Sequence, residues 1–278
     1  MRIERKETPV ALTIAGSDSG GGAGIQADLK TFAALGVHGT SAIACLTAQN
    51  PRRVLGVEPA SPKMLRQQIQ AVFEELNPAA VKTGMLFSAE NVRVVAVFFG
   101  AQAARQRVPL VVDPVMISTS GAKLLESAAV KILKEELLPL AALVTPNLDE
   151  AETLTGRRPA SVEEMRGAAR EIHSRFGCAA LVKGGHLRDV PEAVDIFFDG
   201  RTELLLTAPF VKGVRTHGTG CTYSAAICAA LALGHKLPQA VQIGKKFVTA
   251  AIANSYRIGK HFALARVPTA TLKNSTEL

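Results

Sequence analysis

Short apolar runs alternate with longer stretches of helical periodicity along most of the chain. The runs are typical of buried strands, and they lie at Val10 to Ala15, Ser41 to Leu46, Ala79 to Lys82, Leu110 to Asp113, Leu143 to Thr145 and Ala180 to Lys183. Helix spacing lies between them, at Ala23 to Leu35, Pro62 to Leu76, Ala89 to Arg105, Ala122 to Leu137 and Val162 to Phe176. This alternation predicts an α/β protein whose central sheet is mostly parallel and covered by helices on both faces.

The rest of the pattern adds an antiparallel edge and further helices. Asp199-Gly200 is a hairpin signal, and the apolar runs Val194 to Phe198 and Glu203 to Leu206 flank it. Three more helices are predicted, at Asn147 to Leu154 with Asn147 as N-cap, Thr219 to Leu233, and Pro238 to Tyr256. There is no internal repeat and no Pro/Gly/Ser linker, so residues 1–278 are predicted to form one domain with its core at about 9–257.

Composition narrows the class of ligand. The net charge is +8, from 32 Lys+Arg against 24 Asp+Glu, which suits nucleic acid, a membrane surface or an anionic small molecule. The basic residues are scattered, and aromatic residues make up only 5% of the chain with no Trp, so the stacking platform of a single-stranded nucleic-acid binder is absent from the sequence. A phosphate-bearing small ligand explains the charge better than nucleic acid does.

Cysteine usage and hydropathy indicate the compartment. The four cysteines form no CxxC and no zinc-ligand spacing, so a reducing cytoplasm is the expectation. The start MRIERKETPV has no apolar segment behind its charges, so no signal peptide is expected. The least charged stretches, Thr31 to Pro51 and Thr216 to His235, are interrupted by Gly, Thr, Ser and His, so we expect no membrane partner.

A glycine-rich segment, Gly16 to Gly24, follows the first predicted strand and opens the first helix. Within it Gly22-Ala-Gly-Ile-Gln-Ala27 matches GxGxxG/A, but the dinucleotide pattern also needs an acid about 20 residues on. Leu29 to Val57 contains no Asp or Glu, which excludes that site. The glycines favour a backbone that approaches a ligand. Asp28, one turn into the helix, is either a surface acid or a substrate anchor.

A second glycine-rich segment, Thr216-His-Gly-Thr-Gly-Cys-Thr-Tyr-Ser224, leads into an apolar helix. Free N–H groups and the helix dipole at such a start form an anion site, to which Gly218 and Gly220 would contribute. Close packing at the helix end is the alternative. Cys221 is either an inert buried thiol or a thiol acidified below its free pKa of about 8.5 by the helix start.

Three further motifs, which contain four candidate residues, lie at or just beyond the ends of predicted strands. Asp113 ends one strand, and Asn147 and Glu150 lie just beyond another, where acids suit Mg²⁺ carrying substrate phosphates. Helix capping explains Asn147 and Glu150 equally well. Lys183, followed by Gly184-Gly185, is predicted to clamp a phosphate at the carboxyl end of its strand.

Taken together, these segments resemble the ribokinase-type kinases, and most closely the hydroxymethylpyrimidine/phosphomethylpyrimidine kinases of thiamine biosynthesis. The resemblance covers about Pro9 to Arg257. Its specific segments are Ala11 to Phe32, Ala48-Gln-Asn50, Lys82-Thr-Gly-Met85, Val112-Asp-Pro-Val-Met116, Thr145-Pro-Asn147, Lys183-Gly-Gly-His186 and Thr216 to Cys221. It implies a ribokinase-like three-layer α/β/α fold.

The resemblance also implies residue roles. The aminopyrimidine would be held by Ala23, Asp28, Gln49, Met85 and Val115. Asp113 and Glu150 fall on the metal side, Asn147, Lys183 and Thr219 by the nucleotide phosphates, and Gly218 to Cys221 on the anion hole. Most ribokinase-type kinases have Asp as the base at the position of Cys221, whereas the pyrimidine kinases have Cys.

The function implied is ATP- and Mg²⁺-dependent phosphorylation of 4-amino-5-hydroxymethyl-2-methylpyrimidine, and then of its monophosphate to the diphosphate. Pyridoxal kinase is the alternative within the same class, since pyridoxal also carries a hydroxymethyl group on a flat ring, and one enzyme can serve both substrates. A non-catalytic pyrimidine sensor is the alternative from another class. The resemblance also implies a homodimer.

Overall fold

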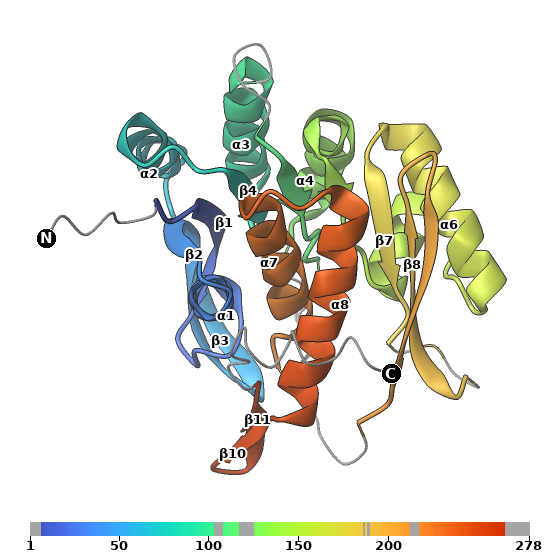
Figure 1. Ribbon diagram of the computed structural model, residues 1–278. Helices are drawn as coiled ribbons and strands as arrows, with labels where there is room; N and C mark the ends of the chain where they lie inside the picture. The colour runs from blue at the N-terminus through green and yellow to red at the C-terminus, as the bar shows by residue number, and fades with distance from the viewer. Residues whose placement is uncertain are drawn as a thin grey trace, which may run out of the picture.

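The computed structural model describes residues 7–102, 108–116, 125–185, 187, 190–211 and 217–264. Across these ranges a nine-stranded sheet has the order β3-β2-β1-β4-β5-β6-β7-β8-β9 (Figure 1). The strands are β1 Val10–Asp18, β2 His38–Asn50, β3 Arg53–Pro59, β4 Ala80–Thr83, β5 Leu110–Val112, β6 Leu143–Val144, β7 Ala179–Lys183, β8 Glu192–Phe198 and β9 Glu203–Pro209. Strands β2, β1 and β4 to β7 are parallel, whereas β3 pairs antiparallel with β2, β8 with β7, and β9 with β8.

Helices cover both faces of this sheet. They are α1 Gly24–Ala34, α2 Pro62–Glu75, α3 Ala89–Gln102, α4 Ser127–Ile132, α5 Leu148–Thr155, α6 Val162–Phe176, α7 Thr219–Ala232 and α8 Leu237–Ala253. A short π-helical turn, Leu133–Leu137, and a 3-10 turn, Leu138–Leu140, continue α4. The chain then adds a small hairpin of β10 Tyr256–Ile258 and β11 His261–Ala263.

Two hydrophobic cores result from the alternation of side chains along the strands. Leu12 of β1 packs in the core beneath α2, α3 and α6, with Leu65, Val95 and Met165. Its neighbour Ala11 packs in the opposite core, beneath α1, α7 and α8. The central strands are buried on both faces, which is why they are continuous apolar runs in the sequence. The predicted fold class, a mostly parallel sheet between two helical layers, is therefore confirmed.

Several boundaries differ from the prediction. Strand β2 runs four residues past Leu46 to Asn50, where it pairs with β3, which the sequence did not indicate because Arg53–Pro59 is largely exposed. The last predicted helix ends at Ala253 rather than Tyr256, since Asn254 caps it and Tyr256 begins β10. Residues 103–105 and 122–124, the end and the start of two predicted helices, lie outside the described residues. No helix in the described ranges combines the length and the apolar character that a membrane crossing needs.

Candidate functional site

A cavity of about 830 Å³ opens where the carboxyl ends of the parallel strands meet the starts of α1, α5 and α7. This is the edge at which open α/β sheets bind ligands. Its lining brings together all but one of the predicted site residues, namely Ala23, Gln49, Met85, Asp113, Val115, Asn147, Glu150, Lys183, Gly218, Thr219, Gly220 and Cys221. Segments separated by up to 198 positions in the chain therefore contribute to one site.

Asp28 is the exception: its complete burial contradicts the surface-acid interpretation, and its role as a substrate anchor stays a prediction. Its carboxylate accepts from both Lys82 Nζ, at 2.7 and 2.8 Å, and Thr13 Oγ1, at 2.6 Å. Its side chain is 0% exposed and does not line the cavity. The helical position of Asp28 turns it toward the sheet rather than toward the cavity. Burial raises the pKa of Asp28 although Lys82 opposes it, whereas the charge of Asp28 outweighs burial and raises the pKa of Lys82. The short contacts of Nζ with both carboxylate oxygens bind the two side chains together as one buried pair.

The two glycine-rich segments pack backbone against backbone beside the cavity. Gly24 and Gly218 both have positive φ values, +57° and +83°. A Cβ on Gly24 would overlap the carbonyl oxygen of Gly16, and one on Gly218 would overlap that of Gly22. Both glycines are therefore required for close approach of backbone to backbone as well as for conformation, which favours the close-packing interpretation at these two positions.

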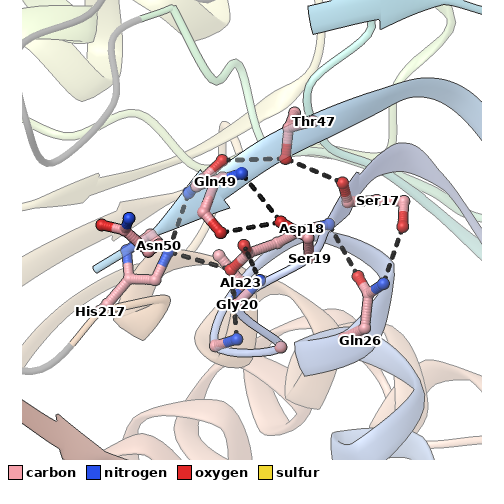
Figure 2. A network of polar contacts seen from close by, with 12 residues as sticks. Ser17, Asp18, Ser19, Gly20, Ala23, Gln26, Thr47, Gln49, Asn50 and His217 are labelled. Atoms are coloured by element: carbon pink, nitrogen blue, oxygen red, sulfur yellow. Dashed lines mark hydrogen bonds and ion pairs between the residues drawn. The ribbon is translucent and has the colours of Figure 1, made fainter. Parts of the chain in front are cut away.

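Asp18, the last residue of β1, organises the first of these loops. Its Oδ1 accepts from the Gly20 N–H at 2.8 Å, and its Oδ2 accepts from the Ala23 N–H at 2.9 Å and lies 3.1 Å from His217 Nε2 (Figure 2). Burial opposes ionisation, but the hydrogen bonds from His217 and the backbone outweigh it and lower the pKa of Asp18. Sequence reasoning assigned a role to neither Asp18 nor His217. The signal available was an acid at a strand end, directly before glycines.

Gln49 reaches the cavity because β2 continues past its predicted end, with an irregularity in register between Ala48 and Gln49. Its amide contacts Thr47 Oγ1 at 3.2 Å and His217 Nε2 at 3.0 Å (Figure 2). Met85 and Val115 belong to a small apolar cluster nearby, which also contains Cys45 and Val57. This side of the cavity thus sets the Gln49 amide, with His217 beside it, next to the apolar side chains of Met85 and Val115, an arrangement that suits a flat heteroaromatic ring with polar edge groups.

The opposite side of the cavity carries charge. Lys183, the last residue of β7, places its Nζ 3.0 Å from Asp113 Oδ1. Thr145 Oγ1 and Ser224 Oγ also donate to Asp113, each at 3.1 Å. Burial would raise the pKa of Asp113, but Lys183 outweighs it and lowers that pKa, while the same carboxylate raises the pKa of Lys183. The Lys183–Asp113 ion pair is therefore largely buried, but both of its residues line the cavity and can contact a ligand there.

Asn147 and Glu150 form a capping box at the start of α5. Asn147 Oδ1 accepts from the Glu150 N–H at 3.0 Å, and Glu150 Oε2 accepts from the Asn147 N–H at 2.8 Å. The capping interpretation is thus confirmed, yet both residues also line the cavity. Burial, opposed by Lys183, raises the pKa of Glu150 to about 7. Among the described residues, no group of three or more His, Cys, Asp or Glu side chains forms a ready metal site.

Helix α7 points its N-terminus into the cavity. It begins at Thr219, and the Thr222 N–H closes its first turn on the carbonyl of Gly218, so the N–H groups before Thr222 lie at the open end of the helix. Burial raises the pKa of Cys221 to about 11, an effect that the charge of Lys82 only partly offsets. Burial therefore favours the inert-thiol interpretation of Cys221 over a thiol acidified by the helix start.

Comparisons with known proteins agree with this geometry. A family model described as Phosphomethylpyrimidine kinase matches residues 18–265. A hydroxymethylpyrimidine/phosphomethylpyrimidine kinase of Rhizobium meliloti is 51% identical over 90% of this chain and 93% of its own. A thiamine biosynthesis bifunctional protein of Geobacter sulfurreducens is 48% identical over 90% of this chain, which spans only half of that longer relative.

Solved structures show the same fold. The ADP complex of Bacillus subtilis pyridoxal kinase superimposes with a TM-score of 0.85 at 34% identity, over 97% of this chain and all of that one. A phosphomethylpyrimidine kinase of Clostridium difficile has a TM-score of 0.77 at 42% identity, over 88% of this chain and all of that one. The match of the family model over most of the chain, together with the identity to full-length relatives, shows that this chain belongs to the phosphomethylpyrimidine kinase family.

Proposed function

We propose that the protein transfers phosphoryl groups from ATP to 4-amino-5-hydroxymethyl-2-methylpyrimidine, and then to the resulting monophosphate, in thiamine biosynthesis. The observation that carries this proposal is one continuous cavity with an apolar, amide-bearing side and a charged side. The first side, with Ala23, Gln49, Met85 and Val115, suits the ring. The second, with Lys183 and the start of α7, suits phosphates.

The chain's own groups supply positioning and charge, which dominate phosphoryl transfer. Lys183 would clamp the transferring phosphate, with Asn147 and Thr219 beside it. The N–H groups at Gly218 to Cys221 would stabilise the charge that develops on the transferred group. Cys221 would contribute a neutral thiol beside these donors, because its raised pKa keeps the proton on sulfur.

Asp113 and Glu150 fit a magnesium ion that arrives with the nucleotide. Mg²⁺ typically takes one or two carboxylates together with substrate phosphates, so a larger cluster is not required. The pKa of Glu150, about 7, leaves its carboxyl poised to lose a proton when a cation binds. Bound there, the ion would neutralise phosphate charge, and Asp113 and Glu150 would hold it beside the phosphates.

Pyridoxal is the second candidate acceptor. The observation that favours it is the likeness to the pyridoxal kinase of Bacillus subtilis, which has a higher TM-score than the Clostridium difficile phosphomethylpyrimidine kinase although its sequence is less similar. An apolar slot with one amide admits either flat ring. The sequence identity favours the pyrimidine.

The quaternary state is part of the proposal. We expect a homodimer, and the exposed apolar side chains of the β2–β3 edge support it: Leu46 is 55% and Leu55 63% exposed. Sedimentation velocity at micromolar concentration measures this directly. A sedimentation coefficient of a 29.3 kDa monomer would contradict the expectation.

The decisive experiment measures ATP turnover separately with hydroxymethylpyrimidine, its monophosphate and pyridoxal. We expect kcat/KM to be highest for the two pyrimidines. Turnover with pyridoxal alone would establish the second candidate. Tight pyrimidine binding with no ATP turnover would indicate a sensor rather than an enzyme.

A further inference from the structure

His217 lies at a point where its hydrogen bonds conflict. A single ring atom, Nε2, is 3.1 Å from Asp18 Oδ2 and 3.0 Å from Gln49 Nε2 (Figure 2). The first neighbour accepts hydrogen bonds and the second donates them. One ring nitrogen cannot be a donor to Asp18 and an acceptor from Gln49 at the same time. The conflict is resolved once the proton on Nε2 is located.

Asp18 locates that proton. Its carboxylate already accepts from three backbone N–H groups, those of Gly20, Gly22 and Ala23, and it is only 3% exposed. An ionised carboxylate has no hydrogen to give, so the facing Nε2 must carry one. A bare Nε2 would set two lone pairs against each other at 3.1 Å inside the protein, which is costly.

Thr47 sets the other side of the Gln49 amide. Thr47 Oγ1 lies 2.9 Å from the carbonyl oxygen of Ser17 and 3.2 Å from Gln49 Oε1. Both of these are acceptors, whereas a hydroxyl has one hydrogen. If Thr47 donates that hydrogen to the Ser17 carbonyl, its Oγ1 can only accept from Gln49. It then bonds the NH₂ group of Gln49 and cannot donate to the amide oxygen of Gln49.

Both conflicts disappear when the Gln49 amide turns by half a rotation. The oxygen and nitrogen of an amide are distinguished by their partners, and here both partners select the same orientation. We infer that His217, held by Asp18, is a positioning residue that fixes the Gln49 amide with its carbonyl toward His217 and its NH₂ toward Thr47, and so selects aminopyrimidines.

The selection depends on the groups that the fixed amide still offers, and this step rests on the proposed function. One N–H and one carbonyl lone pair remain for a ligand, side by side and in a fixed order. An aminopyrimidine presents the complement, an amino donor next to a ring-nitrogen acceptor, whereas pyridoxal has no amino group. A reversed amide would require the ring to turn over, which would carry its hydroxymethyl group away from Lys183 and α7.

Gly22 supports the assignment from the packing side. A Cβ at Gly22 would lie 3.0 Å from Cδ2 of His217, so the glycine loop leaves just enough space for the imidazole ring. The side chain of His217 is only 15% exposed. The ring is therefore confined between the loop and Gln49, as a positioning role requires.

The test compares two ligands without turnover. Titration calorimetry in the absence of ATP would give Kd for 4-amino-5-hydroxymethyl-2-methylpyrimidine and for its analogue without the amino group. We expect the intact protein to prefer the amino compound by roughly tenfold to a hundredfold, because an unpaired amide is left by the analogue. In His217→Phe, which keeps a ring but has no N–H, we expect the preference to fall at least fivefold.

Two variants provide matched controls. His217→Gln restores an N–H donor and should keep most of the preference, and His235→Phe, at an exposed histidine, should keep all of it. A His217→Phe protein with the full preference would overturn the inference and leave the proposed function standing. No preference in the intact protein would overturn the inference together with the proposed substrate.

A spectroscopic measurement does not depend on the ligand affinity of any variant. Long-range ¹H–¹⁵N correlation of the histidine rings of the intact protein reports which nitrogens carry a proton. We expect a protonated Nε2 on the ring whose signals vanish in His217→Gln. An unprotonated Nε2 would overturn the inference, because the amide would then have to donate to it.

Discussion

Two of the lysine–aspartate ion pairs beside the cavity, Lys82–Asp28 and Lys183–Asp113, differ in how far their side chains are exposed. Lys82 of β4 bonds both oxygens of Asp28, and both side chains are 0% exposed. Lys183 of β7 bonds one oxygen of Asp113, and 13% of its side chain is exposed at the cavity. The same pair of residue types is fully buried in one place, where Lys82 lies at the wall of the cavity, and partly exposed in the other.

The difference comes from the neighbours of each lysine in the chain and in the fold. Lys82 lies inside its strand, and α1 carries Asp28 over it. Lys183 ends its strand, and Gly184-Gly185 comes next with no side chain to cover it. Burial depth, rather than residue type, therefore decides whether a charged pair stabilises the fold or serves a ligand.

The largest effect is expected when the fully buried Lys82–Asp28 pair is disrupted, and it is a loss in the free energy of unfolding. Lys82→Met leaves Asp28 buried without its cation, which typically costs about 3–5 kcal/mol. We expect the free energy of unfolding, measured with urea, to fall by that amount. The double variant Lys82→Met/Asp28→Asn removes both charges and should recover at least half of the loss. A loss below about 1 kcal/mol in the single variant would show that the sealed pair is not structural.

A substitution in the Lys183–Asp113 pair should instead lower the rate of phosphoryl transfer. Lys183→Ala removes a cation from the transferring phosphates, and the loss of one such contact typically costs about a hundredfold in kcat. We expect that loss for every acceptor, since the clamp acts on the nucleotide side. Lys236→Ala, at an exposed lysine, is the control. A fall of less than about threefold would favour a solvent-facing Lys183 with no role in transfer.

This contrast also marks how far the sequence can predict the molecule. The strands were predictable because a parallel sheet buries both faces, so that Leu12 and Ala11 are both apolar although they enter different cores. Strand β3 was not, because its exposed residues carry no apolar period. Motifs at strand ends placed Lys183, Asp113 and Gln49 at the cavity for the same reason, since parallel strands deliver their carboxyl ends to one edge.

Orientation could not be predicted from the sequence. Asp28 lies in one of the specific segments of the family resemblance, Ala11 to Phe32, but its helix turns it toward the sheet rather than into the cavity. Asp18 and His217 are 199 positions apart, and nothing in either local pattern indicates that they meet. Cys221 has the helix start that acidifies thiols, yet its burial reverses the effect. Each of these outcomes depends on packing between distant elements.

A smaller effect is expected on the pH dependence of stability. Since the pKa of Glu150 is about 7 when folded against an ordinary 4.5, the folded chain binds more protons than the unfolded chain between these values. Stability from this group is complete below 4.5 and is lost as pH rises through 7. Glu150→Gln can still accept from the Asn147 N–H and should remove this loss. Relative to the parent, we expect its free energy of unfolding to be higher at about pH 8 than at about pH 4 by about 3 kcal/mol.

Urea unfolding of the two proteins across this pH range measures the difference directly. The comparison between parent and variant cancels the other groups that titrate in the same window. A difference independent of pH would contradict a raised pKa at Glu150 and would place the carboxylate in a more polar environment than its burial indicates.

The smallest effect is expected at Cys221, which lies between the two ion pairs. Burial raises the pKa of its thiol most strongly, Lys82 lowers that pKa, and Asp28 and Asp113 raise it further. With a pKa of about 11, the thiol is ionised in only about one molecule in ten thousand at pH 7. A general base typically contributes about 10²–10⁴-fold, and a protonated thiol cannot supply it.

Cys221→Ala should therefore slow transfer by less than about tenfold, and equally for both acceptors. The equal loss for the two acceptors is the more stringent test of whether Cys221 is a base. The hydroxymethyl group must lose a proton during transfer, whereas the monophosphate, with a second pKa of about 6, is already mostly ionised at pH 7, so a base would help only the first acceptor. Steady-state rates with saturating ATP on both acceptors measure it, with Cys228→Ala, deeper in the same helix, as the control. A loss of a hundredfold or more with hydroxymethylpyrimidine, but not with its monophosphate, would contradict this expectation. It would mean that substrate binding changes the balance of burial and of the charges of Lys82, Asp28 and Asp113 so that the Cys221 thiol ionises.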